Sequence, residues 1–143
     1  MTARLLRFDL DELRRAYGRL VPPGADPRLD TSPFRAFRAD LLDAAAHAAT
    51  VPCRLEVWWE GTFNGYLLVV AVTPPDALPD LDLAALPPPD DERVAPPRPD
   101  RYPLAHVEPG RATVAQNADG TTNEAPFGAA TGHFGAPGMR AVP

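Results

Sequence analysis

One stretch of the sequence decides the fold: Cys53–Thr73, which reads CRLEVWWEGTFNGYLLVVAVT. It is rich in aromatic and β-branched residues, and it is divided by Asn64-Gly65, the dipeptide that the type I′ turns of β-hairpins prefer. The stretch therefore predicts two antiparallel strands joined by a two-residue turn. In the register set by this turn, Trp59 lies opposite Val70.

Alternation along these strands divides their side chains between two faces. One face is wholly apolar or amphipathic and consists of Cys53, Leu55, Val57, Trp59, Phe63, Tyr66, Leu68, Val70 and Val72. In the same register Phe63 lies opposite Tyr66. Because the residue pattern and the turn agree, we expect this face to form the core, with helices packed on it.

The opposite face of the hairpin mixes charged and apolar side chains. It carries Arg54, Glu56, Trp58, Glu60 and Thr62 on the first strand, and Leu67, Val69 and Ala71 on the second. A face open to water does not need Trp58 across from Leu67 and Val69. Either a segment of the same chain covers it, such as an N-terminal strand over Ala3–Phe8, or a partner does. Trp58, Leu67 and Val69 are therefore candidate partner-binding residues.

Two helices are predicted before the hairpin. Asp9 is suited to cap the first helix, with Glu12 three positions later as its partner in a capping box. Ser32-Pro33 places a cap residue before a proline at the first helical position, and the second helix should end near Thr50. Helical spacing gives the second helix one apolar face, formed by Phe34, Phe37, Leu41, Ala45 and Ala48.

The composition changes abruptly after the hairpin. Eleven prolines fall within residues 74–111, which predicts an extended, acidic linker, and residues 112–143 read as an extended tail rich in glycine and alanine. Four leucines interrupt the linker and could dock on the domain: Leu78, Leu81, Leu83 and Leu86. The predicted fold is thus a small α+β domain over residues 1–73. It has two helices packed on a β-hairpin and an optional third strand at the N-terminus, and a Pro-rich extended C-terminal arm follows it.

Charge and hydropathy exclude several classes of function. The formal net charge is −5, and all fourteen of the Lys and Arg residues are arginine. Residues 1–73 are neutral and the rest are acidic, so the basic stripe that nucleic acid requires is missing. The longest apolar run, Tyr66–Val72, is far shorter than the ~20 residues of a membrane span. We therefore expect a cytoplasmic protein that binds neither nucleic acid nor membranes.

Catalytic and metal-binding signatures are weak. The three histidines, His47, His106 and His133, are widely separated, and none has a second ligand at metal-binding spacing. Cys53 and His47 could form a nucleophile pair, but Cys53 falls on the core face, where a cysteine usually acts as a small hydrophobe. The segment Asn117–Gly120 lacks the acidic ligands of a calcium loop and is read as a turn. We expect no cofactor and no metal.

The leading hypothesis is therefore a non-catalytic accessory or assembly subunit. It would bind a larger protein complex or particle through the compact domain and the extended arm, with Phe127 and Phe134 as the contact points of the arm. The alternative is a small regulatory or inhibitory protein that binds through the face around Trp58. An enzyme with an unrecognised site is a third option, and a homo-oligomer is compatible with each of them.

Overall fold

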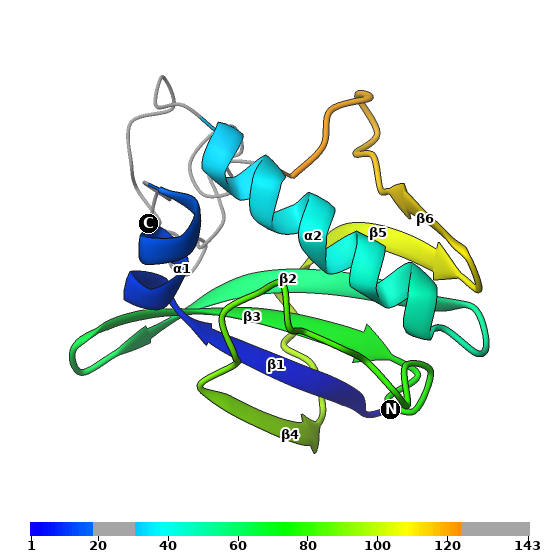
Figure 1. The fold of residues 1–143 in the computed structure, drawn as a ribbon, viewed down its shortest axis with the longest axis horizontal. Helices are drawn as coiled ribbons and strands as arrows, with labels where there is room; N and C mark the ends of the chain where they lie inside the picture. Colours follow the sequence, from blue (N-terminus) through cyan, green and yellow to red (C-terminus); the bar gives the residue numbers. More distant parts are fainter. Residues whose placement is uncertain (19–30, 124–143) are drawn as a thin grey trace.

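A computed structural model describes residues 1–18 and 31–123 of the chain (Figure 1). The elements in chain order are β1 (Ala3–Asp9), α1 (Leu10–Tyr17), α2 (Ser32–Ala48), β2 (Cys53–Thr62), β3 (Gly65–Thr73), β4 (Asp91–Ala95), β5 (Tyr102–Glu108) and β6 (Arg111–Val114). The strands form one antiparallel sheet in the order β4-β1-β3-β2-β5-β6. Both helices lie on the same side of this sheet (Figure 1). The fold is thus α+β, as the sequence predicts.

The predicted hairpin is formed by β2 and β3, in a register two residues away from the predicted one. Thr62 pairs with Gly65, so the turn consists of Phe63 and Asn64 instead of Asn64-Gly65. A shift of two residues leaves every strand side chain on its face, since the side-chain period of a strand is two. The predicted faces are therefore right, whereas the opposed pairs are wrong and Phe63 lies at the turn.

The helices begin and end almost where the sequence places them. Asp9 caps α1, because its carboxylate accepts a hydrogen bond from the backbone N–H of Glu12 at 3.1 Å. Helix α2 begins at Ser32 itself, one residue early, with Thr31 in the N-cap position. The predicted apolar face of α2 is entirely buried and packs on the sheet: Phe34, Phe37, Leu41, Ala45 and Ala48.

The sheet continues well beyond the predicted domain boundary at residue 73. Strand β4 pairs with β1, and β5 pairs with β2, although the proline-rich sequence predicts a linker for both segments. The prolines are accommodated because of where they fall. Pro103 lies at an irregularity where the β2–β5 register shifts. On the other edge of β5, pairing with β6 begins only at Ala105, so Pro103 has no strand partner on that edge. Residues 74–114 are therefore part of the domain, which corrects the predicted division.

The leucine-containing segment between β3 and β4 docks on the helix side of the sheet, as expected. Leu78 and Leu86 are buried in the main core, and Leu81 and Leu83 pack against it. The segment is held to the end of α2 by a hydrogen bond from the N–H of Thr50 to the carbonyl of Ala77, at 3.0 Å. This segment therefore completes the core that α1 and α2 begin.

Candidate functional site

The face of the sheet opposite the helices is covered by the chain itself. Strands β4 and β5 lie on opposite sides of β1, β3 and β2, so residues 96–101 between them must cross the sheet. Arg101 fixes the side on which they cross, because its Nε donates to the Glu56 carboxylate of this face at 2.8 Å. Arg98 reaches the carbonyl of Trp59 at 3.4 Å. In Figure 1 this connection passes behind the strands.

The crossing segment changes the interpretation of the predicted partner-binding residues. Trp58 is only 2 % exposed, and Leu67 and Val69 are buried as well. Trp58 and Val69 form a second small core with Ala3, Leu5 and Ala71, against which Ala95 of β4 packs. Of the two alternatives left open by the sequence, the chain supplies its own cover: the N-terminal strand β1 places Ala3 and Leu5 with Trp58, and residues 96–101 cross over the face. A partner could reach Trp58 only by displacing that segment.

The charged side chains of this covered face are paired with one another. Arg7 forms ion pairs with Glu60 and, at 3.3 Å from its Nε, with Asp91 of β4. The indole N–H of Trp58 donates to the Glu60 carboxylate at 3.0 Å. These contacts tie β1, β2 and β4 together, so they account for the charges as structural ion pairs.

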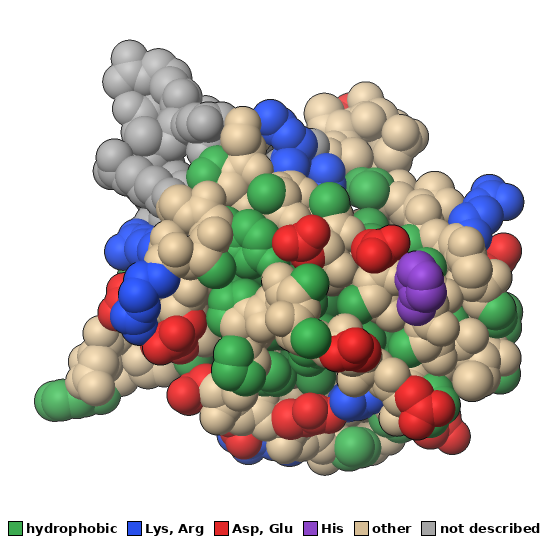
Figure 2. Space-filling model, viewed as in Figure 1, with side chains coloured by type: hydrophobic (Ala, Val, Ile, Leu, Met, Phe, Trp, Pro, Cys, Tyr) green, Lys and Arg blue, Asp and Glu red, His purple; other side chains and the backbone are tan. Residues whose placement is uncertain are grey.

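The nucleophile and metal candidates lack the environment that their chemistry needs. Cys53 is buried, and burial raises the pKa of its thiol, the opposite of what a nucleophilic cysteine requires. Figure 2 shows acidic side chains around one histidine on the helix-covered face, where a hollow is lined by Asp40, Asp43 and His47. Within residues 1–18 and 31–123, however, no three or more His, Cys, Asp or Glu side chains are grouped to hold a metal ion.

The feature that stands out is the tip of the β2–β3 hairpin. Phe63 is fully exposed (103 %), and Tyr66 is partly exposed (37 %), with its ring edge-on to Trp59 at 6.2 Å between centroids. The tip is exposed because the pairing of β5 with β2 ends at Val57 and that of β1 with β3 ends at Leu67. The hairpin therefore extends past its neighbours (Figure 1), and Figure 2 shows a hydrophobic side chain protruding at that end.

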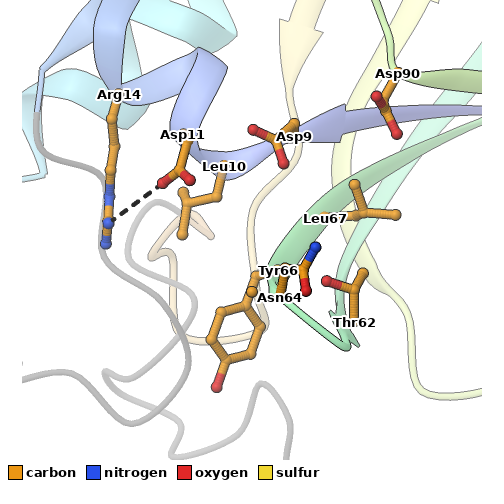
Figure 3. A pocket seen from close by; sticks show the side chains of 10 residues that line it. Asp9, Leu10, Asp11, Arg14, Thr62, Asn64, Tyr66, Leu67 and Asp90 are labelled. Atoms are coloured by element: carbon orange, nitrogen blue, oxygen red, sulfur yellow. Dashed lines mark ion pairs between the residues drawn. The ribbon is translucent and has the colours of Figure 1, made fainter.

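A hollow of about 630 Å³ lies beside this tip, between the hairpin and the start of α1 (Figure 3). Its hairpin wall includes Tyr66, and its opposite wall includes Asp9, Asp11 and Arg14. Asp90, which precedes β4, adds a third carboxylate to the lining. The single arginine is 3.9 Å from a carboxylate oxygen of Asp11. Among the described residues, the lining thus carries three carboxylates and one guanidinium group, so their charges leave an excess of acidic groups beside the tip.

Sequence reasoning missed the tip because it assigned Phe63 to the core face. The two registers put the same side chains on the same faces, so the hydrophobic pattern cannot distinguish them. The preference of type I′ turns for Asn-Gly then favoured the register that the structure does not adopt. The other aromatic candidates, Phe127 and Phe134, lie outside the described residues, and their role as anchors stays a prediction.

No protein-family model matches this chain, and neither a curated protein nor a solved structure is significantly similar to it. None of the helices in the described parts of the chain is both long and apolar enough to cross a membrane. The case for a function therefore depends on the geometry of the hairpin tip and its surroundings.

Proposed function

We propose that this protein is a non-catalytic accessory subunit of a larger protein assembly, and that the tip of the β2–β3 hairpin is the contact made by its compact domain. The observation that carries the proposal is the full exposure of Phe63 at the end of a hairpin that reaches past the sheet. Phe63 is fully exposed on the described part of the chain, so its aromatic ring is free to contribute to an interface instead of to the core. Aromatic side chains that enter a partner's pocket often dominate the energy of an interface.

The rest of the fold supports a binding role for the tip. One face of the sheet is packed against the helices, and the other is covered by residues 96–101. The large apolar side chains of both faces are thus used within the chain. A protruding hairpin, by contrast, can enter a partner without disturbing either core, because its last residues pair only with each other.

The second contact of the proposal is the C-terminal arm, with Phe127 and Phe134 as its anchors. The two contacts are separable, because the tip lies in β2–β3 and the arm follows the last described residue, Asn123. Asn123 is itself fixed to the domain, since its side-chain amide donates to the carbonyl of Pro103 at 2.7 Å. A partner that holds both contacts would gain from their linkage.

Photo-crosslinking from the tip tests the proposal. A benzophenone amino acid replaces Phe63 in the full-length protein, which is expressed and irradiated in its native cells. We expect a covalent adduct with one specific protein, identified by mass spectrometry. The matched control carries the same photoreactive residue at Val94, which is also exposed (61 %) but lies on edge strand β4. Identical adducts from both positions, or none from the tip, would contradict the proposal.

A further inference from the structure

The acidic hollow beside the hairpin tip constrains what the tip can bind. Asp11 and Asp90 approach it from two separate segments, the start of α1 and the residue before β4, while Phe63 lies at the end of the hairpin that forms the other wall. Thr62 and Asn64, the residues on either side of Phe63, line the hollow, so a partner that encloses the Phe63 ring lies next to these carboxylates. Covering a carboxylate without a compensating charge or hydrogen bond is costly, so the partner must supply positive groups.

Resting on the proposed function, we infer that the partner is a protein with an apolar pocket for Phe63 and a basic rim whose Arg or Lys side chains enter the hollow. The volume of about 630 Å³ lies within the range of pockets that accept small ligands, so a long cationic side chain has room there. Tyr66 lines the same hollow, and an aromatic ring attracts a cation placed over its face. Complementary charges of this kind select partners and speed their encounter.

Charge also argues against the other occupants of this surface. A second copy would bring the same carboxylates of Asp11 and Asp90 to the interface, and each chain carries a net charge of −5. Like charges brought together at an interface repel, and nucleic acid would be repelled for the same reason. A basic protein surface is the occupant that matches both the exposed aromatic ring and the carboxylates.

A displayed library of random 12-residue peptides serves as the probe, selected on the immobilised full-length protein. We expect enrichment of peptides that combine Arg or Lys with an apolar residue. The two test variants are Asp11→Asn/Asp90→Asn, which removes two of the three carboxylates of the hollow and leaves the Asp9 cap in place, and Phe63→Ser. The matched control is Asp43→Asn, which removes an equally exposed charge from α2, away from the tip.

Synthetic versions of the enriched peptides are then measured by fluorescence polarisation. The expected result is binding at least tenfold weaker to Asp11→Asn/Asp90→Asn and to Phe63→Ser, with the Asp43→Asn variant like the wild type. Wild-type affinity should also fall between 50 and 300 mM salt, because salt screens exposed charges. Folding of every variant is checked by its thermal transition.

Three outcomes would overturn this inference. They are enrichment without basic residues, equal binding to the charge variant, and the absence of any peptide that depends on Phe63. A dimer of the wild-type protein that is lost in Phe63→Ser, measured by sedimentation, would assign the surface to a second copy instead. None of these results decides the proposed function, which the adducts formed from position 63 test separately.

Discussion

The covered second face of the sheet makes a quantitative prediction for Trp58. If residues 96–101 shield this face, truncating Trp58 must cost as much stability as truncating Trp59, its neighbour on the helix side. The two indoles point to opposite faces of β2, and their exposures are 2 % and 6 %. A domain with a core on only the helix side of the sheet would instead lose stability only when Trp59 is truncated.

The size of the effect follows from burial. Replacing a buried Phe or Trp by Ala typically costs 3–5 kcal/mol, so we expect about 4 kcal/mol for each substitution. Against a total stability of about 5–15 kcal/mol for a domain, such a loss is large enough to measure precisely. Trp58→Phe keeps an aromatic ring but loses the N–H bond to Glu60, and it should cost about 2 kcal/mol. Phe63→Ala, at the exposed tip, should stay within ~0.5 kcal/mol of the wild type.

Urea unfolding followed by far-ultraviolet circular dichroism is the appropriate assay, because tryptophan fluorescence changes with the substitutions themselves. The free energy of unfolding comes from the midpoint and slope of each transition. A loss below about 1 kcal/mol for Trp58→Ala, beside a full loss for Trp59→Ala, would refute the reasoning. It would mean that residues 96–101 leave the face open, and a partner surface at Trp58 would again be the better explanation.

Three further predictions test other parts of the fold. A chain ending after residue 75 should show no cooperative thermal transition, because it lacks β4, β5 and the leucines that complete the core; a sharp transition would show that these are dispensable. Burial raises the pKa of both Cys53 and Tyr17, so the fold favours their neutral forms. The free energy of unfolding should therefore fall as the pH rises above the pKa values of these groups in an unfolded chain, about 8.5 for Cys and 10 for Tyr. Between pH 7 and 11 the urea midpoint should fall less steeply with pH in Cys53→Ala and Tyr17→Phe than in the wild type. The same pH dependence in the variants and the wild type would contradict this. Phe127→Ala/Phe134→Ala should leave the thermal transition intact but remove a specific partner from native-lysate pull-downs, whereas an identical partner set would exclude the anchor role.

Local signals in the sequence were sufficient for the helices and for the faces of the hairpin. The Asp9 cap and the spacing of Phe34 and Phe37 depend on residues within one or two turns, so short-range rules describe them well. The two faces of β2 follow from alternation alone. The register did not follow, because both candidate registers bury the same side chains and only the local preference for Asn64-Gly65 separated them.

Strands β4 and β5 could not be found from their own residues. Strand β4 is five residues long, contains three charges and buries none of its side chains fully, so its sequence does not have the pattern of a buried strand. Its conformation comes from pairing with β1, and that of β5 comes from pairing with β2. Strand formation that depends on a distant partner is decided by tertiary contacts more than by propensity. The proline count therefore described these residues correctly as extended and wrongly as unpaired.

The pairing of β4 and β5 with distant strands also explains why the candidate site is Phe63 and not Trp58, because residues 96–101 join these two strands across the Trp58 face. In the sequence, one face of the hairpin carries more apolar surface than the solvent-exposed face of a soluble protein usually does, and a partner is one way to cover it. Once residues 96–101 cover Trp58, that reason for a partner disappears. What remains is an aromatic side chain that the register shift places where no segment of the described chain can bury it. Phe63 is therefore a stronger indication of an interface than Trp58 was, because the fold neither needs it at the turn nor shields it there.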